Sequence, residues 1–170
     1  MAGFVPTPVP TGPAAPTYVV WRKATRGRAA LAVVLVFGNI GFAWFEGALW
    51  FADRHDTLSG PLYAHVDLVG ALSHLLGIFA LIPVIIANIR AVRAVRTGQP
   101  ITPAQQAARV GRHVAAVRTL LPVIAMIGML MGRPRGQAVV YLVMFLGFAI
   151  GEAVFSWLLA AWTVKGLRST

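Results

Sequence analysis

The sequence predicts an all-α integral membrane protein in which four transmembrane helices form one bundle. The 170-residue chain is 58% hydrophobic and only 12% charged, which is typical of polytopic membrane proteins and not of soluble domains. Four long apolar runs occupy most of the chain, and the segments that join them are short. The basic residues gather at alternate ends of these runs, which is the pattern that orients helices in a membrane.

Each predicted span is long enough to cross about 30 Å of hydrocarbon, although the third is the weakest. Only 14 residues separate Arg118 from Arg133. We therefore expect residues 114–117 to contribute to this span and the Arg118 side chain to extend to the nearer headgroups. The four predicted spans are residues 29–51, 62–89, 114–132 and 138–164.

The spans define a single membrane domain, residues 29–164, with a tail at each end. Residues 1–28 are proline-rich and then basic. The first 16 residues contain five prolines and no basic residue, so they lack the features of a signal peptide and favour an extended tail. Residues 165–170 form a short tail. Residues 90–113 predict a basic helical hairpin that turns at 97–100, with Thr102 as N-cap, Pro103 at N1 and Gln105 at N3.

The charge distribution predicts the orientation of the bundle and its partners. Twelve of the 15 basic residues fall on one side, so we expect both termini in the cytoplasm. The composition, rich in Ala, Val, Arg and Gly, suits a bacterial plasma membrane. The basic residues flank apolar runs and belong to no nucleic-acid module, so nucleic acid is not expected as a partner. We expect anionic lipid headgroups or an acidic partner to contact Arg90, Arg93, Arg96, Arg109 and Arg112.

Polar side chains within the spans are the candidate functional positions, because an ionisable group there costs about 2.5–3.5 kcal/mol at the membrane centre. Two pairs stand seven residues apart and therefore share a helix face, one on the first span and one on the second. Their depths predict an outer pair, Glu46 with Asp67, and a midplane group of Asn39, His74 and Glu152. The predicted buried polar layer comprises Asn39, Glu46, Asp67, His74, Glu152 and Ser156.

Three interpretations of this layer remain open. It fixes helix register, it forms a path for a proton or cation inward from Glu46 and Asp67, or it surrounds a haem b or quinone near His74. A bis-His haem site is disfavoured, since His65 lies about half a turn out of phase with His74. The absence of cysteine excludes disulfides and thiolate ligands within the chain, and no catalytic motif or metal site is recognised.

Small residues on the third and fourth spans suit close helix packing. They form two G-x-x-x-G motifs, Gly128 with Gly132 and Gly147 with Gly151. With no catalytic motif, these faces favour an accessory or structural subunit of a larger membrane complex, or a homodimer. The alternatives are a small proton- or cation-coupled transporter that uses Glu46, Asp67, His74 and Glu152, and an electron-transfer subunit that holds haem b or quinone.

Overall fold

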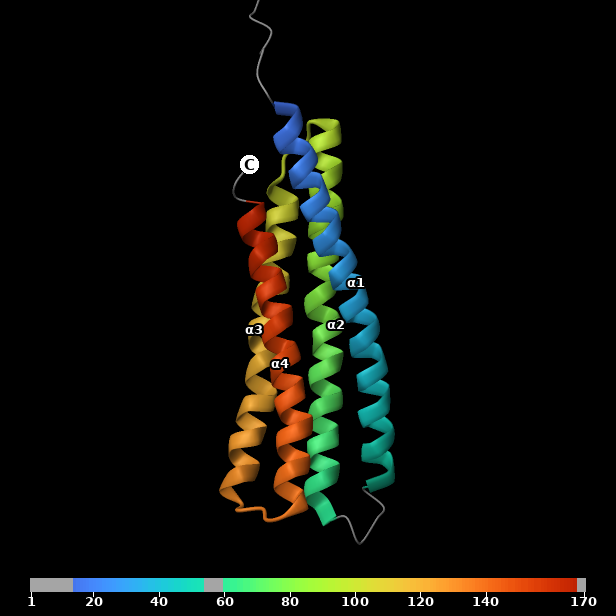
Figure 1. Cartoon of the computed structure of the whole chain (residues 1–170), viewed down its shortest axis with the longest axis vertical. Helices are drawn as coiled ribbons and strands as arrows, with labels where there is room; N and C mark the ends of the chain where they lie inside the picture. Colours follow the sequence, from blue (N-terminus) through green and yellow to red (C-terminus); the bar gives the residue numbers. More distant parts are fainter. Residues whose placement is uncertain (1–13, 54–59, 168–170) are drawn as a thin grey trace, which may run out of the picture.

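The chain folds as four long helices that lie side by side. The computed structural model describes residues 14–53 and 60–167, with side chains for 24–53 and 62–167. Within these ranges each helix is long and apolar enough to cross a membrane, so the predicted all-α fold with four candidate spans is confirmed. The helices are α1 (Ala14–Asp53), α2 (Gly60–Thr97), α3 (Thr102–Met131) and α4 (Gln137–Gly166). Figure 1 shows that α1 begins and α4 ends where α2 turns into α3, which we call the basic end.

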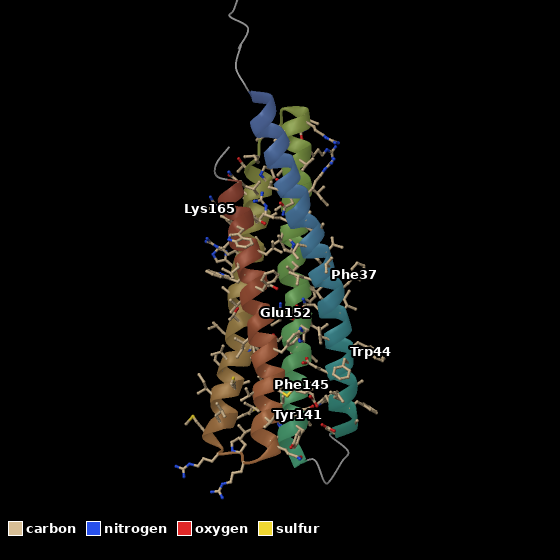
Figure 2. All side chains as sticks on the ribbon, viewed as in Figure 1. Phe37, Trp44, Tyr141, Phe145, Glu152 and Lys165 are labelled. Carbon is tan, nitrogen blue, oxygen red and sulfur yellow. The ribbon has the colours of Figure 1, made fainter. Side chains whose placement is uncertain are left out.

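The outside of the bundle is coated with large apolar side chains, as expected of a surface that faces lipid. On α1, Phe37 is 70% exposed and Trp44 is 77% exposed, and both point away from the other helices in Figure 2. Similar side chains cover the outer faces of α2, α3 and α4. An exposed apolar area of this extent is unfavourable in water, so it indicates an integral membrane protein.

The helix α2 lies at the centre of the packing. It contacts all three other helices, whereas α1 and α4 barely touch each other. The core between the helices is made mainly of alanine and leucine, and these small and medium side chains let the backbones approach closely. At the basic end this core consists of Ala87, Ala91, Ala104, Ala108, Val164 and Leu167.

The turn between α2 and α3 lies where the sequence predicts it, but α3 begins differently. Gly98 adopts a positive φ of 66°, which ends α2 at Thr97. The N-cap of α3 is Ile101 and not Thr102, and no side chain caps this helix. Gln105 does not complete a capping box, because its amide donates to the backbone oxygen of Leu167 at 2.9 Å. The side chain thus ties the start of α3 to the end of α4.

The helices α2 and α3 approach each other closely at Gly111, which provides a test of the packing. A Cβ at this position would lie 2.8 Å from the backbone oxygen of Ala80 and 2.9 Å from Val84 Cγ2. We expect Gly111→Ala to push α3 from α2 and to destabilise the fold by about 1–3 kcal/mol. Gly128→Ala is the matched control, since nothing lies within 4 Å of a Cβ there. Thermal unfolding in mild detergent measures both variants, and equal melting temperatures would contradict the close approach.

Candidate functional site

The centre of the bundle contains a buried arginine from α3. The side chain of Arg118 is 0% exposed. Its Nη2 donates to Glu152 Oε2 at 2.9 Å, and its Nη1 donates to Ser156 Oγ at 3.1 Å. We expected this guanidinium to reach the headgroups, and the structure corrects that expectation. Because α3 is already helical from Thr102, Arg118 lies roughly 24 Å along the helix from the basic end, too far for an arginine side chain to span.

The carboxylate of Glu152 joins α4 to the other three helices. Its Oε1 accepts a hydrogen bond from Asn39 Nδ2 of α1. Its Oε2 lies 2.6 Å from His74 Nδ1 of α2 and 2.9 Å from Arg118 Nη2 of α3. Figure 2 shows Glu152 about half-way along α4. The structure therefore brings the predicted midplane group of Asn39, His74 and Glu152 together, with Arg118 as a fourth member.

The imidazole of His74 bridges two carboxyl groups. Since Glu152 Oε2 already accepts from a guanidinium, the 2.6 Å contact to His74 requires the hydrogen on Nδ1. The other ring nitrogen, Nε2, lies 3.5 Å from Glu46 Oε2. Glu46 is 2% exposed and His74 is 0% exposed, so the pair is shielded from water. One proton on either Nε2 or Oε2 would make this pair neutral as a whole.

Two glycines of α2 make room for these charged groups. Gly70 and Gly77 are seven residues apart and share one face of the helix. A Cβ at Gly70 would collide with the carboxylate of Glu46, and a Cβ at Gly77 would collide with Asn39 Oδ1 and the guanidinium of Arg118. These glycines therefore leave room for buried polar side chains from α1 and α3. Small residues commonly permit close approach between membrane helices, and here they permit the approach of side chains.

The predicted outer pair is divided between two sites. Glu46 joins His74, as described above. Asp67, also buried, accepts a hydrogen bond from the hydroxyl of Tyr141 on α4, and the two oxygens are 2.6 Å apart. The ring of Tyr141 stacks on Phe145, with centroids 4.3 Å apart. Sequence reasoning missed Tyr141, although it stands 11 residues, close to three helical turns, before Glu152 and so shares its helix face.

A cavity of about 230 Å³ opens between α1 and α4, where these two helices make little contact. Glu46 forms its polar wall, and Phe42 and Phe148 also stand against His74. The Phe42 ring stacks on the imidazole, with centroids 5.3 Å apart and planes 26° apart. The cavity is lined by Phe42, Phe45, Glu46, Met144, Phe145 and Phe148. An aromatic compartment therefore connects the lipid-facing side of the bundle with the His74–Glu46 pair.

The remaining predicted residues lie outside this centre. Among the arginines at the basic end, Arg112 is half-buried and the other four, Arg90, Arg93, Arg96 and Arg109, are exposed. The glycines of the two G-x-x-x-G motifs make no close contact with another helix in the described chain. Nothing lies within 4 Å of a Cβ at Gly128, Gly147 or Gly151, and Gly132 meets only its own helix.

The geometry of His74 bears on the haem interpretation. Both ring nitrogens face carboxyl oxygens, and the ring is packed against Phe42. Neither nitrogen therefore points into a space where it could coordinate a haem iron. In the part of the chain that the structure describes, no group of three or more His, Asp or Glu side chains has the arrangement of a metal site.

Comparison of the chain with protein-family models, curated proteins and solved structures finds no match in any of the three.

The ion pair between Arg118 and Glu152 provides a test of the site. Arg118→Met leaves a buried carboxylate without its fixed positive partner, so we expect a loss of about 3–5 kcal/mol of stability. Arg109→Met, on the exposed face of the same helix, serves as the control and stays within about 0.5 kcal/mol of the parent.

The double variant Arg118→Met with Glu152→Met removes both charges. It is expected to unfold at a higher temperature than Arg118→Met alone, because no unpaired charge remains. Thermal unfolding in mild detergent measures the series. Equal stability of Arg118→Met and Arg109→Met would contradict the central role of the pair.

Proposed function

We propose that the protein is a small proton-coupled carrier of lipophilic organic cations. The observation that carries this proposal is the position of Glu46, which forms the polar wall of the cavity between α1 and α4 and has its Oε2 atom 3.5 Å from His74 Nε2. Buried carboxyl and histidine side chains in membrane helices are typical of proton-handling sites. The same pair therefore stands where a proton and a second ligand would meet.

The charge balance of the site favours exchange of one cation for one proton. The Arg118–Glu152 pair is neutral, and the His74–Glu46 pair is neutral while it keeps its proton. Loss of that proton leaves one uncompensated negative charge in a medium of low dielectric constant, which is strongly unfavourable. A cation in the cavity next to Glu46 would compensate that charge, so its entry and the loss of the proton favour each other.

The lining of the cavity supports a lipophilic organic cation as the ligand. Four phenylalanine rings surround the space, and aromatic faces attract cations whose charge is spread over an apolar body. A small hydrated ion would find too few oxygen ligands here. Four of the lining side chains, Phe42, Phe45, Met144 and Phe148, are between 40% and 64% exposed on the lipid-facing surface. A ligand dissolved in the bilayer would therefore reach the cavity from the side.

We also propose the orientation that the charge bias predicts, with the basic end and both termini in the cytoplasm of a bacterium. Asp67 and Tyr141 then lie on the outer side of Glu46. Asp67 stands three residues, close to one turn, before Gly70, which faces the Glu46 carboxylate. This spacing makes Asp67 the nearest proton acceptor on α2 between Glu46 and the outer end, and it supports an outward proton path.

The first test uses tetraphenylphosphonium as the probe cation with the purified full-length chain. We expect binding to release about one proton per cation and to weaken as the pH falls, because the proton and the cation compete for one carboxylate. Glu46→Gln removes the negative charge without changing the shape, so it is expected to weaken binding at least about tenfold. Calorimetry in two buffers of different ionisation enthalpy measures affinity and proton release together.

Asp53→Asn is the matched control, since it removes a carboxylate that interacts with Asp67 at the end of α1 but does not line the cavity. It is expected to retain the affinity and the proton release of the parent. Binding without proton release, or equal binding by Glu46→Gln, would contradict the proposed exchange.

A second proposal, an accessory subunit or a homodimer, is favoured by the outward G-x-x-x-G of α4. No other helix of the described chain comes within 4 Å of a Cβ at Gly147 or Gly151. A surface of this kind permits close packing against a further helix, from a second copy or another subunit.

Gly147→Leu with Gly151→Leu blocks this face and is expected to abolish an association that the parent chain maintains in mild detergent. Ala116→Leu, an exposed small residue on α3, is the control and is expected to leave the association intact. Size-exclusion chromatography with light scattering measures the mass of each species. A parent chain that migrates as a monomer with no associated protein would exclude the second proposal.

A further inference from the structure

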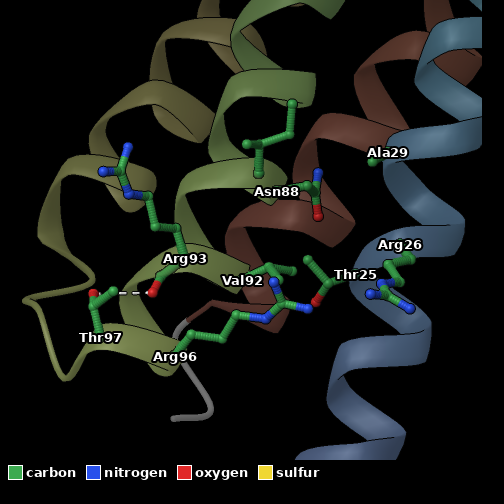
Figure 3. Close-up of a pocket in the computed structure, with 9 residues that line it drawn as sticks. Thr25, Arg26, Ala29, Asn88, Val92, Arg93, Arg96 and Thr97 are labelled. Carbon is green, nitrogen blue, oxygen red and sulfur yellow. Dashed lines mark hydrogen bonds between the residues drawn. The ribbon is translucent and has the colours of Figure 1, made fainter.

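A second cavity lies away from the buried network, in a groove between α1 and α2 at the basic end. It has a volume of about 510 Å³. Figure 3 shows Arg26 on α1 and Arg96 on α2 beside the groove, whereas the guanidinium of Arg93 is directed away from Arg26, on the far side of α2. In the same view the Arg96 side chain extends toward Thr25 of the facing helix. The complete lining is Thr25, Arg26, Ala29, Asn88, Ile89, Val92, Arg93, Arg96 and Thr97.

The three arginines of the groove have no acidic partner in the described chain. Arg26, Arg93 and Arg96 are exposed, and none of them forms an ion pair with a described carboxylate. No Asp or Glu occurs before Glu46 or between Asp67 and Glu152 in the sequence. The groove therefore concentrates positive charge that the described side chains do not neutralise, and it suits an anionic ligand.

The groove has charged residues at its outer part and apolar residues nearer the membrane centre, which matches the headgroup and acyl chains of a phospholipid. Ala29 and Ile89 stand at the ends of the apolar runs of α1 and α2, and the charged residues lie beyond them. Along the helix axis, Arg26 lies roughly 4.5 Å beyond Ala29, and Arg96 lies roughly 10.5 Å beyond Ile89. The headgroup layer occupies about 5–7 Å on each side of the hydrocarbon. The backbone of Arg26 thus lies within this layer and that of Arg96 just beyond it, with the apolar walls below them.

We propose that this groove is a binding site for one anionic phospholipid. The phosphate lies between Arg26 and Arg96, whose planar guanidinium groups suit bidentate contact with phosphate oxygens. The part of the acyl chain next to the headgroup lies against Ala29, Ile89 and Val92. An acidic peptide would match the charge but would leave these apolar walls exposed. The lipid satisfies both features, and it would stabilise the packing of α1 on α2.

The test measures lipid binding to the full-length chain by native mass spectrometry in detergent. The probes are phosphatidylglycerol and phosphatidylcholine with identical acyl chains. We expect one phosphatidylglycerol to bind with higher affinity than phosphatidylcholine. The double variant Arg26→Gln with Arg96→Gln is expected to weaken phosphatidylglycerol binding on the order of 25-fold, since each well-placed arginine contributes about fivefold.

The matched control removes the same charge at the same end of the molecule. Arg90→Gln with Arg109→Gln changes two exposed arginines that do not line this groove, and it is expected to weaken binding less than about fivefold. Circular dichroism verifies that both double variants retain their helices. An equal loss in the control would show that the surface potential alone attracts the lipid, and it would overturn the proposal.

Two further arms keep the proposal testable if the charge variant fails to fold. Val92→Phe fills the groove without removing a charge and is expected to displace the lipid. Inorganic phosphate is expected not to compete at concentrations at which phosphatidylglycerol binds. Lipid binding unaffected by Val92→Phe, or displacement by inorganic phosphate, would overturn the assignment of a phospholipid site.

Discussion

The whole arrangement depends on the carboxylate of Glu152 and its contact with the buried guanidinium of Arg118. In a bilayer the hydrophobic effect does not drive helices together, so helix association depends on close packing and on polar contacts between helices. Glu152 receives hydrogen bonds from Asn39, His74 and Arg118, one from each of the other three helices. Any rotation of a single helix would leave a charged or polar group without its partner, which is costly in a dry interior. This one group therefore restricts the rotation of all four helices.

The network separates a fixed ion pair from an exchangeable proton. Arg118 remains charged under all ordinary conditions, so its pair with Glu152 is a permanent element of the site. The His74–Glu46 pair on the opposite side is different, because an imidazole and a carboxyl group each have a neutral and a charged form. It also lies where α1 and α4 make little contact. The rigid pair thus lies among tightly packed helices, and the exchangeable pair lies beside the loosest interface.

Sequence reasoning identified much of this site because helical periodicity places residues on faces. The spacing of seven put Asn39 and His74 on inward faces at the depth of Glu152, and the structure places these three residues in contact. The buried position of Arg118 was not predicted, because an arginine near the end of a short apolar run can either extend to the headgroups or pair inside the bundle. A signal was nevertheless present. The buried positions of α3 recur every three or four residues, and they are Ala104, Ala108, Gly111, Ala115, Arg118 and Pro122.

The residue that Glu46 contacts depends on three-dimensional geometry, which residue spacing in the sequence does not predict. Glu46 and Asp67 were placed at one depth from the lengths of their spans, yet Glu46 contacts His74, a residue about two turns further along α2 than Asp67. A carboxylate on a flexible side chain can extend toward a neighbour one turn away, and Gly70 leaves the space for it. A glycine can leave room for a neighbouring helix backbone or for a neighbouring side chain. Which of the two occurs depends on the packing of all four helices.

Electroneutrality provides the constraint that connects the buried network with the proposed exchange. An isolated charge in the interior of a membrane bundle costs several kcal/mol, so states of the site with one unbalanced charge are rarely populated. With Arg118 and Glu152 already balanced, the His74–Glu46 pair is neutral only with its own proton or with a cation from outside. A site that held both would carry a net positive charge, and a site that held neither would carry a net negative one. The balance of two acids against one arginine and one histidine therefore favours exchange of the two ligands over their joint transport.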